Sequence, residues 1–194
     1  MKKQLFTPPF LPLKKAGKYE NYHLEKKDHP GEWFLSSIKM YLHSQFYRKA
    51  KKPNLKPWIE EYRGYKNSEK PVITWLGHAS ILIQIGNLNV LADPIITSPS
   101  WLYKRVLPFG GESHELPKID LVILSHNHRD HMDAETIKLL QKRHEPLFLV
   151  PEGDKLWFTR RGIDKVEEFN WWQTWQQGEL NFTFVPAWHW SQRG

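Results

Sequence analysis

Short apolar runs separated by turn residues make up most of the chain from Val72 onward. The first three runs cover residues 72–76, 81–85 and 88–92. Gly86-Asn87, between the second and third runs, is a dipeptide typical of a two-residue hairpin turn. The pattern therefore predicts three strands that form an antiparallel meander.

After this meander the pattern changes to alternating strands and helices. Residues 119–124 form a nearly continuous apolar run, as expected of a strand that is buried on both faces. Asp133 is a suitable N-cap for a helix that carries Ile137 and Leu140. Further strands are expected at residues 147–150, 166–169 and 180–186, with a short helix at 153–162. This order predicts an α/β layered domain over residues 71–194.

Residues 1–70 show a different pattern, with six prolines and little alternation, which predicts a basic, extended N-terminal arm. Apolar residues at three- and four-residue steps between Glu32 and Arg48, including Phe34 and Phe46, predict one amphipathic helix in this arm. Two roles stay open for the helix. It packs against the main domain as ordinary core, or it contacts a membrane surface with help from the lysines in residues 49–56.

Composition restricts the class of protein. A chain of 194 residues with 40% hydrophobic residues is long enough for one globular domain with its own core. No apolar run approaches the roughly 18 residues of a membrane-spanning helix, and the lysine-rich start is not followed by a signal-peptide core, which predicts a cytoplasmic protein. The absence of cysteine excludes disulfides, thiolate zinc ligands and a cysteine nucleophile.

The formal charge of +7 is unevenly distributed along the chain. Residues 1–70 carry 16 Lys+Arg against 7 Asp+Glu, whereas residues 71–194 carry 12 against 14. The basic character thus belongs to the arm, and the α/β domain is slightly acidic. A slightly acidic domain lacks the basic groove that attracts a phosphate backbone, which argues against nucleic acid as a partner.

The densest group of chemically active side chains follows the buried strand, in the segment Ser125-His126-Asn127-His128-Arg129-Asp130-His131. Neutral imidazole and carboxylate are ligands that zinc and similar divalent metals prefer. The strand end fixes the backbone, and the loop lets His126 and His128 face one ion while Asp130 and His131 face a neighbouring one. The segment therefore predicts a metal site at the end of this strand.

This segment resembles the signature His-x-His-x-Asp-His of the metallo-β-lactamase superfamily. A finer resemblance is to the N-acyl-phosphatidylethanolamine-hydrolysing phospholipase D family and its bacterial relatives. It is carried by five phrases, which are ITWLGHAS at 73–80, ADPI at 92–95, LPKID at 116–120, SHNHRDHMD at 125–133 and Trp188-His189-Trp190.

The resemblance implies an αββα sandwich that binds two zinc ions. The first ion would be held by His126, His128 and His189, and the second by Asp130 and His131. A bridging aspartate and a last histidine lie further downstream in the family, beyond Gly194. The sequence therefore appears as the first half of the fold, with three explanations open: a truncated reading frame, a fragment, or a half that pairs with another copy as a homodimer.

Several further residues have two open interpretations. His78 follows Gly77 at a strand end, where it either lines the cleft or serves as a structural histidine. Asp93 either accepts a proton from a ligand histidine or forms a turn before Pro94. The remaining histidines have no comparable context and are expected at the surface; they are His23, His29, His43, His114 and His144.

The function implied by the resemblance is zinc-dependent hydrolysis of a phosphodiester, with an N-acylated phospholipid as substrate and peripheral contact with a membrane. Asp130 is expected to accept a proton during catalysis as well as to bind metal. Two alternatives stay open. One is another hydrolase of the same fold, such as a lactonase or nuclease, and the other is a non-catalytic metal-binding remnant.

Overall fold

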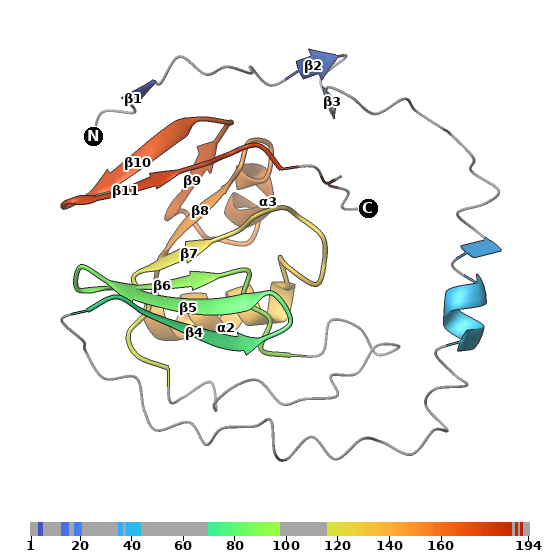
Figure 1. The fold of residues 1–194 in the computed structure, drawn as a ribbon, viewed down its shortest axis with the longest axis horizontal. Helices are drawn as coiled ribbons and strands as arrows, with labels where there is room; N and C mark the ends of the chain where they lie inside the picture. The colour runs from blue at the N-terminus through green and yellow to red at the C-terminus, as the bar shows by residue number, and fades with distance from the viewer. Residues whose placement is uncertain are drawn as a thin grey trace. The chain divides into compact units, whose positions relative to one another are not determined.

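The computed structural model describes residues 4–5, 13–15, 18–20, 35–36, 38–43, 70–97, 116–187, 189 and 191. The chain divides into two compact units, one made of Met1–Pro12 with Tyr62–Gly194 and one made of Leu13–Glu61. The larger unit contains the sheet and both helices that position residues 125–131, called the histidine-rich loop below (Figure 1). The expected domain boundary at residue 70 stays a prediction.

A mixed six-stranded sheet with the order β4-β5-β6-β7-β8-β9 forms the centre of the larger unit (Figure 1). Its strands are β4 (Val72–Gly77), β5 (Ser80–Ile85), β6 (Leu88–Ala92), β7 (Leu121–Ile123), β8 (Leu147–Pro151) and β9 (Val166–Phe169). The first three strands pair antiparallel, and β6 to β9 pair parallel. The expected α/β class is confirmed, including the antiparallel meander.

The turn between β5 and β6 shows why this hairpin forms. Gly86 and Asn87 both have positive φ, at 54° and 62°. Type I′ hairpin turns, whose twist matches that of the strands, require positive φ at both positions, and glycine and asparagine tolerate it best. A side chain at Gly86 would also approach Leu180, because a Cβ there would lie 3.0 Å from Leu180 Cδ1. The turn residues therefore set the register of the meander.

Two helices connect the parallel strands and cover one face of the sheet. They are α2 (Ala134–His144), between β7 and β8, and α3 (Lys155–Thr159), between β8 and β9. Residues from both helices join one buried cluster with alternate residues of the strands, among them Ile137, Leu140, Phe158, Leu82, Val122 and Phe148. Burial of these side chains holds the histidine-rich loop between β7 and α2 at the edge of a rigid core.

Asp133 begins α2 as the sequence predicts. Its backbone is extended, and its Oδ2 accepts a hydrogen bond of 2.8 Å from the backbone N–H of Thr136. This bond satisfies one of the free N–H groups of the first turn and is worth about 1 kcal/mol. Asp133 also accepts a hydrogen bond of 2.9 Å from Thr97 Oγ1. The cap therefore fixes the point where the histidine-rich loop ends.

A second, three-stranded sheet has the order β1-β10-β11. It consists of β1 (Gln4–Leu5), β10 (Gln173–Gln177) and β11 (Leu180–Thr183). The hairpin of β10 and β11 is antiparallel, and β1 pairs antiparallel with β10. The sequence did not predict β10 or β1, and β11 ends earlier than the expected strand at 180–186.

The smaller unit contains β2 (Leu13–Lys15) and β3 (Lys18–Glu20), which pair antiparallel. Residues 38–43 are helical, within the predicted amphipathic helix, and Ile38, Tyr41 and Leu42 are exposed. Phe34, Phe46 and the lysines of residues 49–56 lie outside the described residues, so both roles of the helix stay predictions. Within the described parts of the chain, none of the helices has the length and hydrophobicity needed to cross a membrane.

Candidate metal centre

The functional side chains gather where several strands end at the same edge of the large sheet. β6 and β7 are parallel, and β4 runs in the same direction as β6 because both pair antiparallel with β5. His78 directly follows β4, Asp93 directly follows β6, and Ser125 begins the loop after β7. The carboxyl ends of strands meeting at one edge are the usual place for a site in an α/β fold.

Three histidines form the first donor group. His126, His128 and His189 offer ring nitrogens that all lie within 4.8 Å of one another. His126 Nε2 and His128 Nδ1 are 2.9 Å apart, and the ring of His189 lies 4.6 Å from that of His126 and 5.1 Å from that of His128, measured between centroids. The structure therefore brings together the three residues that the resemblance implied for the first metal.

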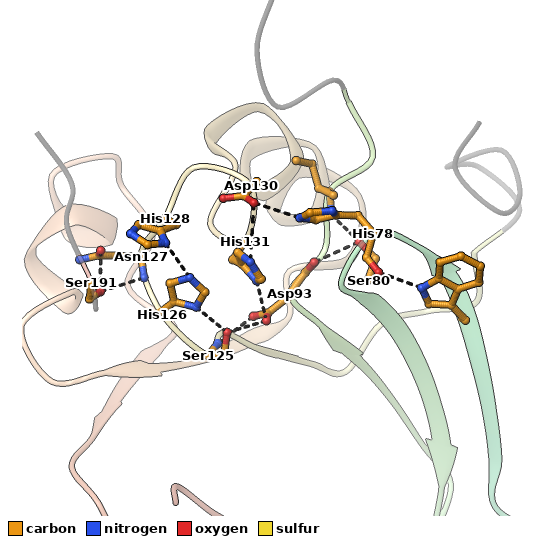
Figure 2. A network of polar contacts seen from close by, with 12 residues as sticks. His78, Ser80, Asp93, Ser125, His126, Asn127, His128, Asp130, His131 and Ser191 are labelled. Atoms are coloured by element: carbon orange, nitrogen blue, oxygen red, sulfur yellow. Dashed lines mark hydrogen bonds and ion pairs between the residues drawn. The ribbon is translucent and has the colours of Figure 1, made fainter. Parts of the chain in front are cut away.

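The second donor group consists of His78, Asp130 and His131. His78 Nε2 lies 3.0 Å from Asp130 Oδ2, and His131 Nε2 lies 3.8 Å from the same oxygen. The two groups are adjacent, because the rings of His126 and His131 are 4.1 Å apart between centroids (Figure 2). His78, for which the sequence left two interpretations open, thus lies beside the two residues implied for the second metal.

Asp93 lies behind both groups and connects them (Figure 2). Its Oδ1 accepts a hydrogen bond of 2.7 Å from the backbone N–H of Ser125, and its Oδ2 accepts one of 2.5 Å from the Ser125 hydroxyl. His131 Nδ1 lies 2.9 Å from the same Oδ2. A carboxylate that receives Nδ1–H leaves Nε2 of that ring unprotonated and available to a metal.

Ser125 extends this arrangement to the first group. Because its hydroxyl donates to Asp93, its oxygen is free to accept Nδ1–H of His126, and the two atoms are 2.9 Å apart. Nε2 of His126, the atom that faces His128, then carries the lone pair. One carboxylate therefore orients a histidine of each group, and this matches the proton-accepting interpretation of Asp93. Its role toward a metal stays a prediction.

The backbone is strained at two of these strand ends. His78 has φ of 52° and Asp93 has φ of 41°, in the left-handed region that residues other than glycine rarely adopt. Such conformations cost about 1–3 kcal/mol each and persist where the surroundings enforce them. At Asp93 the enforcing contacts include its N–H to the Ile123 carbonyl, 3.0 Å, and its carbonyl to the Ser80 hydroxyl, 3.0 Å.

The two groups differ in their protonation. Burial is the largest cause that lowers the pKa of His126, to about 4, and the neighbouring histidines lower it further. Burial and His189 also lower the pKa of His128. In contrast, the hydrogen bond to Asp93 raises the pKa of His131. Burial opposes ionisation of Asp130, but its own backbone N–H and the nearby His131 and His78 bring its pKa below the ordinary value.

These properties fit a divalent metal. The first group offers three imidazole nitrogens that lie close together, and zinc prefers such nitrogen ligands at three positions with a fourth left open. The second group adds an ionised carboxylate, which balances the charge of a second cation. No thiolate is present anywhere in the chain to favour a softer metal.

The comparisons with known proteins agree with this geometry. Residues 88–194 match the family described as the beta-lactamase superfamily domain. The chain belongs to this family. The expected superfamily is thereby confirmed. The matched residues include the whole histidine-rich loop and His189.

Individual relatives give a narrower view. Over 144 residues the chain is 35% identical to the mitochondrial N-acyl-phosphatidylethanolamine-hydrolyzing phospholipase D of Saccharomyces cerevisiae, covering 70% of this chain and 30% of that enzyme. It is 32% identical over 120 residues to a metal-dependent hydrolase of Methanopyrus kandleri, covering 62% of this chain and 48% of the relative. The chain thus spans between about a third and a half of these two relatives.

Among solved structures, a metallo hydrolase from Ignicoccus hospitalis matches with a TM-score of 0.50 and 21% identity. The match covers 61% of this chain and 49% of that protein. At this identity the likeness concerns the fold alone, and it agrees with the mixed six-stranded sheet described above.

One expectation about the histidines is wrong. His144, expected at the surface, is only 8% exposed. Its Nδ1 accepts a hydrogen bond of 3.3 Å from the backbone N–H of Ile119, and burial lowers its pKa. His144 therefore fastens the end of α2 to the segment before β7. His43 is exposed as expected, while His23, His29, His114, Trp188 and Trp190 lie outside the described residues.

Sequence analysis also missed three residues that contact this site. Ser125 belongs to the quoted motif but had no assigned role. Asn127 contacts Ser191 and Asp154 through hydrogen bonds between side chains. No sequence signal identifies Ser191 as part of the site, because its contact depends on how the segment after β11 folds back.

Proposed function

We propose that this chain is the metal-holding part of a hydrolase that cleaves a phosphodiester, with zinc as the metal and an N-acylated phospholipid as the substrate. The observation that carries the proposal is the convergence of His126, His128 and His189, which come from a loop after β7 and a segment after β11. The 35% identity to the yeast N-acyl-phosphatidylethanolamine-hydrolyzing phospholipase D supports the narrower choice of substrate.

In this proposal the first group holds one ion and the second group holds another. Such an ion supplies Lewis-acid polarisation of a phosphoryl oxygen and makes a hydrolytic nucleophile available at neutral pH. Asp93 and Ser125 orient His126 and His131 through the hydrogen bonds described above. In the neutral rings these contacts place the proton on Nδ1 and direct Nε2 toward the site.

Asp130 has two proposed roles. Its lowered pKa keeps the carboxylate ionised, which suits a ligand of the second ion. The second role is to accept a proton on its carboxylate during the reaction. An Asp130→Asn variant that keeps both its metal content and its rate would refute the proton-accepting role.

The αββα sandwich that the resemblance implies requires a second sheet against the face of the large sheet opposite the two helices. Ile73 and Trp75 lie on this face at the edge strand β4 and are 72% and 64% exposed. The same face carries Ile81 on β5, which is half-buried, and Val90 on β6, which is fully buried, so the apolar face is exposed mainly at β4. In an αββα sandwich a second sheet would cover it, which agrees with the rule that large apolar patches mark contact surfaces.

The experiment is a hydrolysis assay on the 194-residue chain with added zinc, using an N-acylated phosphatidylethanolamine in vesicles as substrate. The matched variant is His126→Ala. We expect hydrolysis that depends on zinc, and a loss in the variant of more than about 100-fold, since even the partners behind metal ligands are worth about 10–100-fold. Equal rates for both proteins, or no zinc binding by the unaltered chain, would refute the proposal.

The alternative hydrolase is tested by further substrates in the same assay. The 32% identity to the Methanopyrus kandleri metal-dependent hydrolase is close to that with the yeast enzyme, so the substrate is the narrower half of the proposal. If the chain hydrolyses a lactone or RNA but not the phospholipid, the proposed metal centre stands and the proposed substrate is wrong. Zinc binding without hydrolysis of any of them would favour the non-catalytic remnant.

A further inference from the structure

The segment that carries His189 is attached to the histidine-rich loop at a second point. Asn127 lies between His126 and His128 in sequence, and Ser191 follows His189 by two residues. Figure 2 shows the side chains of Asn127 and Ser191 next to each other, beside the histidine cluster. Two segments that are 64 residues apart thus meet at the metal centre twice, once through imidazoles and once through an amide and a hydroxyl.

Two hydrogen bonds join Asn127 to Ser191. The backbone N–H of Asn127 donates to Ser191 Oγ at 3.2 Å, and the Ser191 hydroxyl donates to Asn127 Oδ1 at 2.6 Å. The serine oxygen is therefore both acceptor and donor toward the same residue. This reciprocal pair restricts the position of Ser191 more tightly than a single hydrogen bond would.

The amide of Asn127 is held at its other end as well. Its Nδ2 donates to Asp154 Oδ1 at 2.9 Å, and Asp154 is only 7% exposed. Asp154 directly precedes α3, and its backbone N–H bonds to the Pro151 carbonyl at 3.2 Å. Asn127 therefore connects Ser191 to a buried carboxylate on the rigid core. The orientation of its side-chain amide is set because Asp154 accepts from Nδ2 and the Ser191 hydroxyl donates to Oδ1.

Regular structure ends before His189, so the contacts of its segment decide where it lies. β11 ends at Thr183, and the residues described between 184 and 191 belong to neither a strand nor a helix. Two residues of chain span at most about 7 Å, so fixing Ser191 restricts where the His189 backbone lies. His126 and His128 also lie beyond the end of their strand, β7, but their loop is held on both sides, by the Ser125 N–H bonded to Asp93 and by the Met132 N–H bonded to the His128 carbonyl at 2.8 Å.

We propose that Asn127 and Ser191 are positioning residues that hold His189 at the first donor group. We call this contact, together with the hydrogen bond from Asn127 to Asp154, the Asn127–Ser191 clasp. This inference rests on the proposed metal centre and adds a requirement to it. Loss of the clasp weakens metal binding at His126, His128 and His189 and leaves the group of His78, Asp130 and His131 unaffected.

The test is a zinc titration of the 194-residue chain labelled with 15N in its histidine rings, followed by the ring-nitrogen NMR signals. We compare Asn127→Ala, Ser191→Ala and Ser191→Thr, which keeps the hydroxyl, with Asn181→Ala on the exposed side of β11 as the control. The two alanine variants should need about 10–100-fold more zinc to shift the His189 signal. Ser191→Thr and Asn181→Ala should behave like the unaltered chain.

The His131 signal distinguishes a positioning role at His189 from a general loss of structure at the metal centre. In both alanine variants it should respond to zinc at the same concentration as in the unaltered chain, and the midpoint of urea unfolding should stay unchanged for Ser191→Ala. If His189 binds zinc equally well in both alanine variants, or if His131 weakens in parallel with His189, the clasp is refuted. No zinc response in the unaltered chain would instead refute the metal centre itself.

Discussion

The two donor groups share one loop but differ in how they are built. The first group consists of imidazoles only, and its third member, His189, comes from a segment after β11. The second group combines two imidazoles with a carboxylate, and all its members lie at the ends of strands of the large sheet or in the loop after β7. The first group thus depends on a distant segment, while the second is built within one sheet.

The electrostatics of the groups differ in the same way. Burial and mutual repulsion keep His126 neutral, with a pKa of about 4, whereas the hydrogen bond to Asp93 raises the pKa of His131. Both rings nevertheless connect to the same carboxylate, His131 directly and His126 through Ser125. The comparison teaches that a direct hydrogen bond to Asp93 outweighs burial and raises the pKa of His131, whereas the upward effect of Asp93 on the pKa of His126 is outweighed by burial and by the neighbouring histidines.

The largest expected effect comes from replacing Asp93 with asparagine, which removes the shared support. One side-chain oxygen becomes an NH2 group and cannot accept, so the hydrogen bonds from Ser125 and His131 are no longer all satisfied. Hydrogen bonds to a charged group are worth about 1.5–3 kcal/mol, and we expect a loss of about 2–4 kcal/mol of unfolding free energy, measured by urea denaturation.

Asp164→Asn, at an exposed position, is the matched control for this variant and should change the unfolding free energy by less than about 0.5 kcal/mol. The pKa of His131 in Asp93→Asn should also fall, which would make the two groups more alike. An unchanged His131 pKa would show that another group causes its upward shift.

A pH titration of the metal-free chain sharpens the electrostatic contrast. The His131 ring should protonate above its ordinary pKa of 6.5 and the His126 ring only near pH 4, as followed by their NMR signals between pH 8 and 3.5. His126 therefore reduces stability as the pH falls from 6.5 toward 4, because the unfolded chain binds the extra proton there.

The contribution of His131 has the opposite sign. Its raised pKa means that the native chain holds the proton more tightly, so its stabilisation is present below pH 6.5 and is lost as the pH rises through the native pKa. Simultaneous protonation of both rings at pH 6.5 would contradict the contrast between the groups.

The smallest expected effect concerns Trp75, whose Nε1–H donates to the His78 carbonyl at 2.8 Å. Trp75→Phe removes this exposed hydrogen bond and should lower the unfolding free energy by less than about 1 kcal/mol. Zinc affinity of the second group, measured by calorimetry, should fall only a few-fold, with the first group unchanged as the internal control. A larger loss at the first group would show that the groups are not supported separately.

The sequence predicted the sheet domain well where strands and helices have strong patterns. The meander, the buried strand after residue 119 and the Asp133 cap follow from apolar periodicity, turn residues and a capping side chain. It did not predict β10, Gln173–Gln177, because glutamines replace the alternating apolar residues that indicate a strand. Pairing with β11 and β1 supplies the backbone hydrogen bonds instead.

The candidate site divides along the same line. By itself, the order of residues 125–131 determined that imidazoles and a carboxylate follow a buried strand, because neighbours in sequence cannot be far apart in space. Only the tertiary structure decided that His78 adjoins Asp130, that Asp93 supports both groups and that Ser191 meets Asn127. Those contacts join positions tens of residues apart, and their distances depend on strand order and on the path of the segment after β11, which no local pattern specifies.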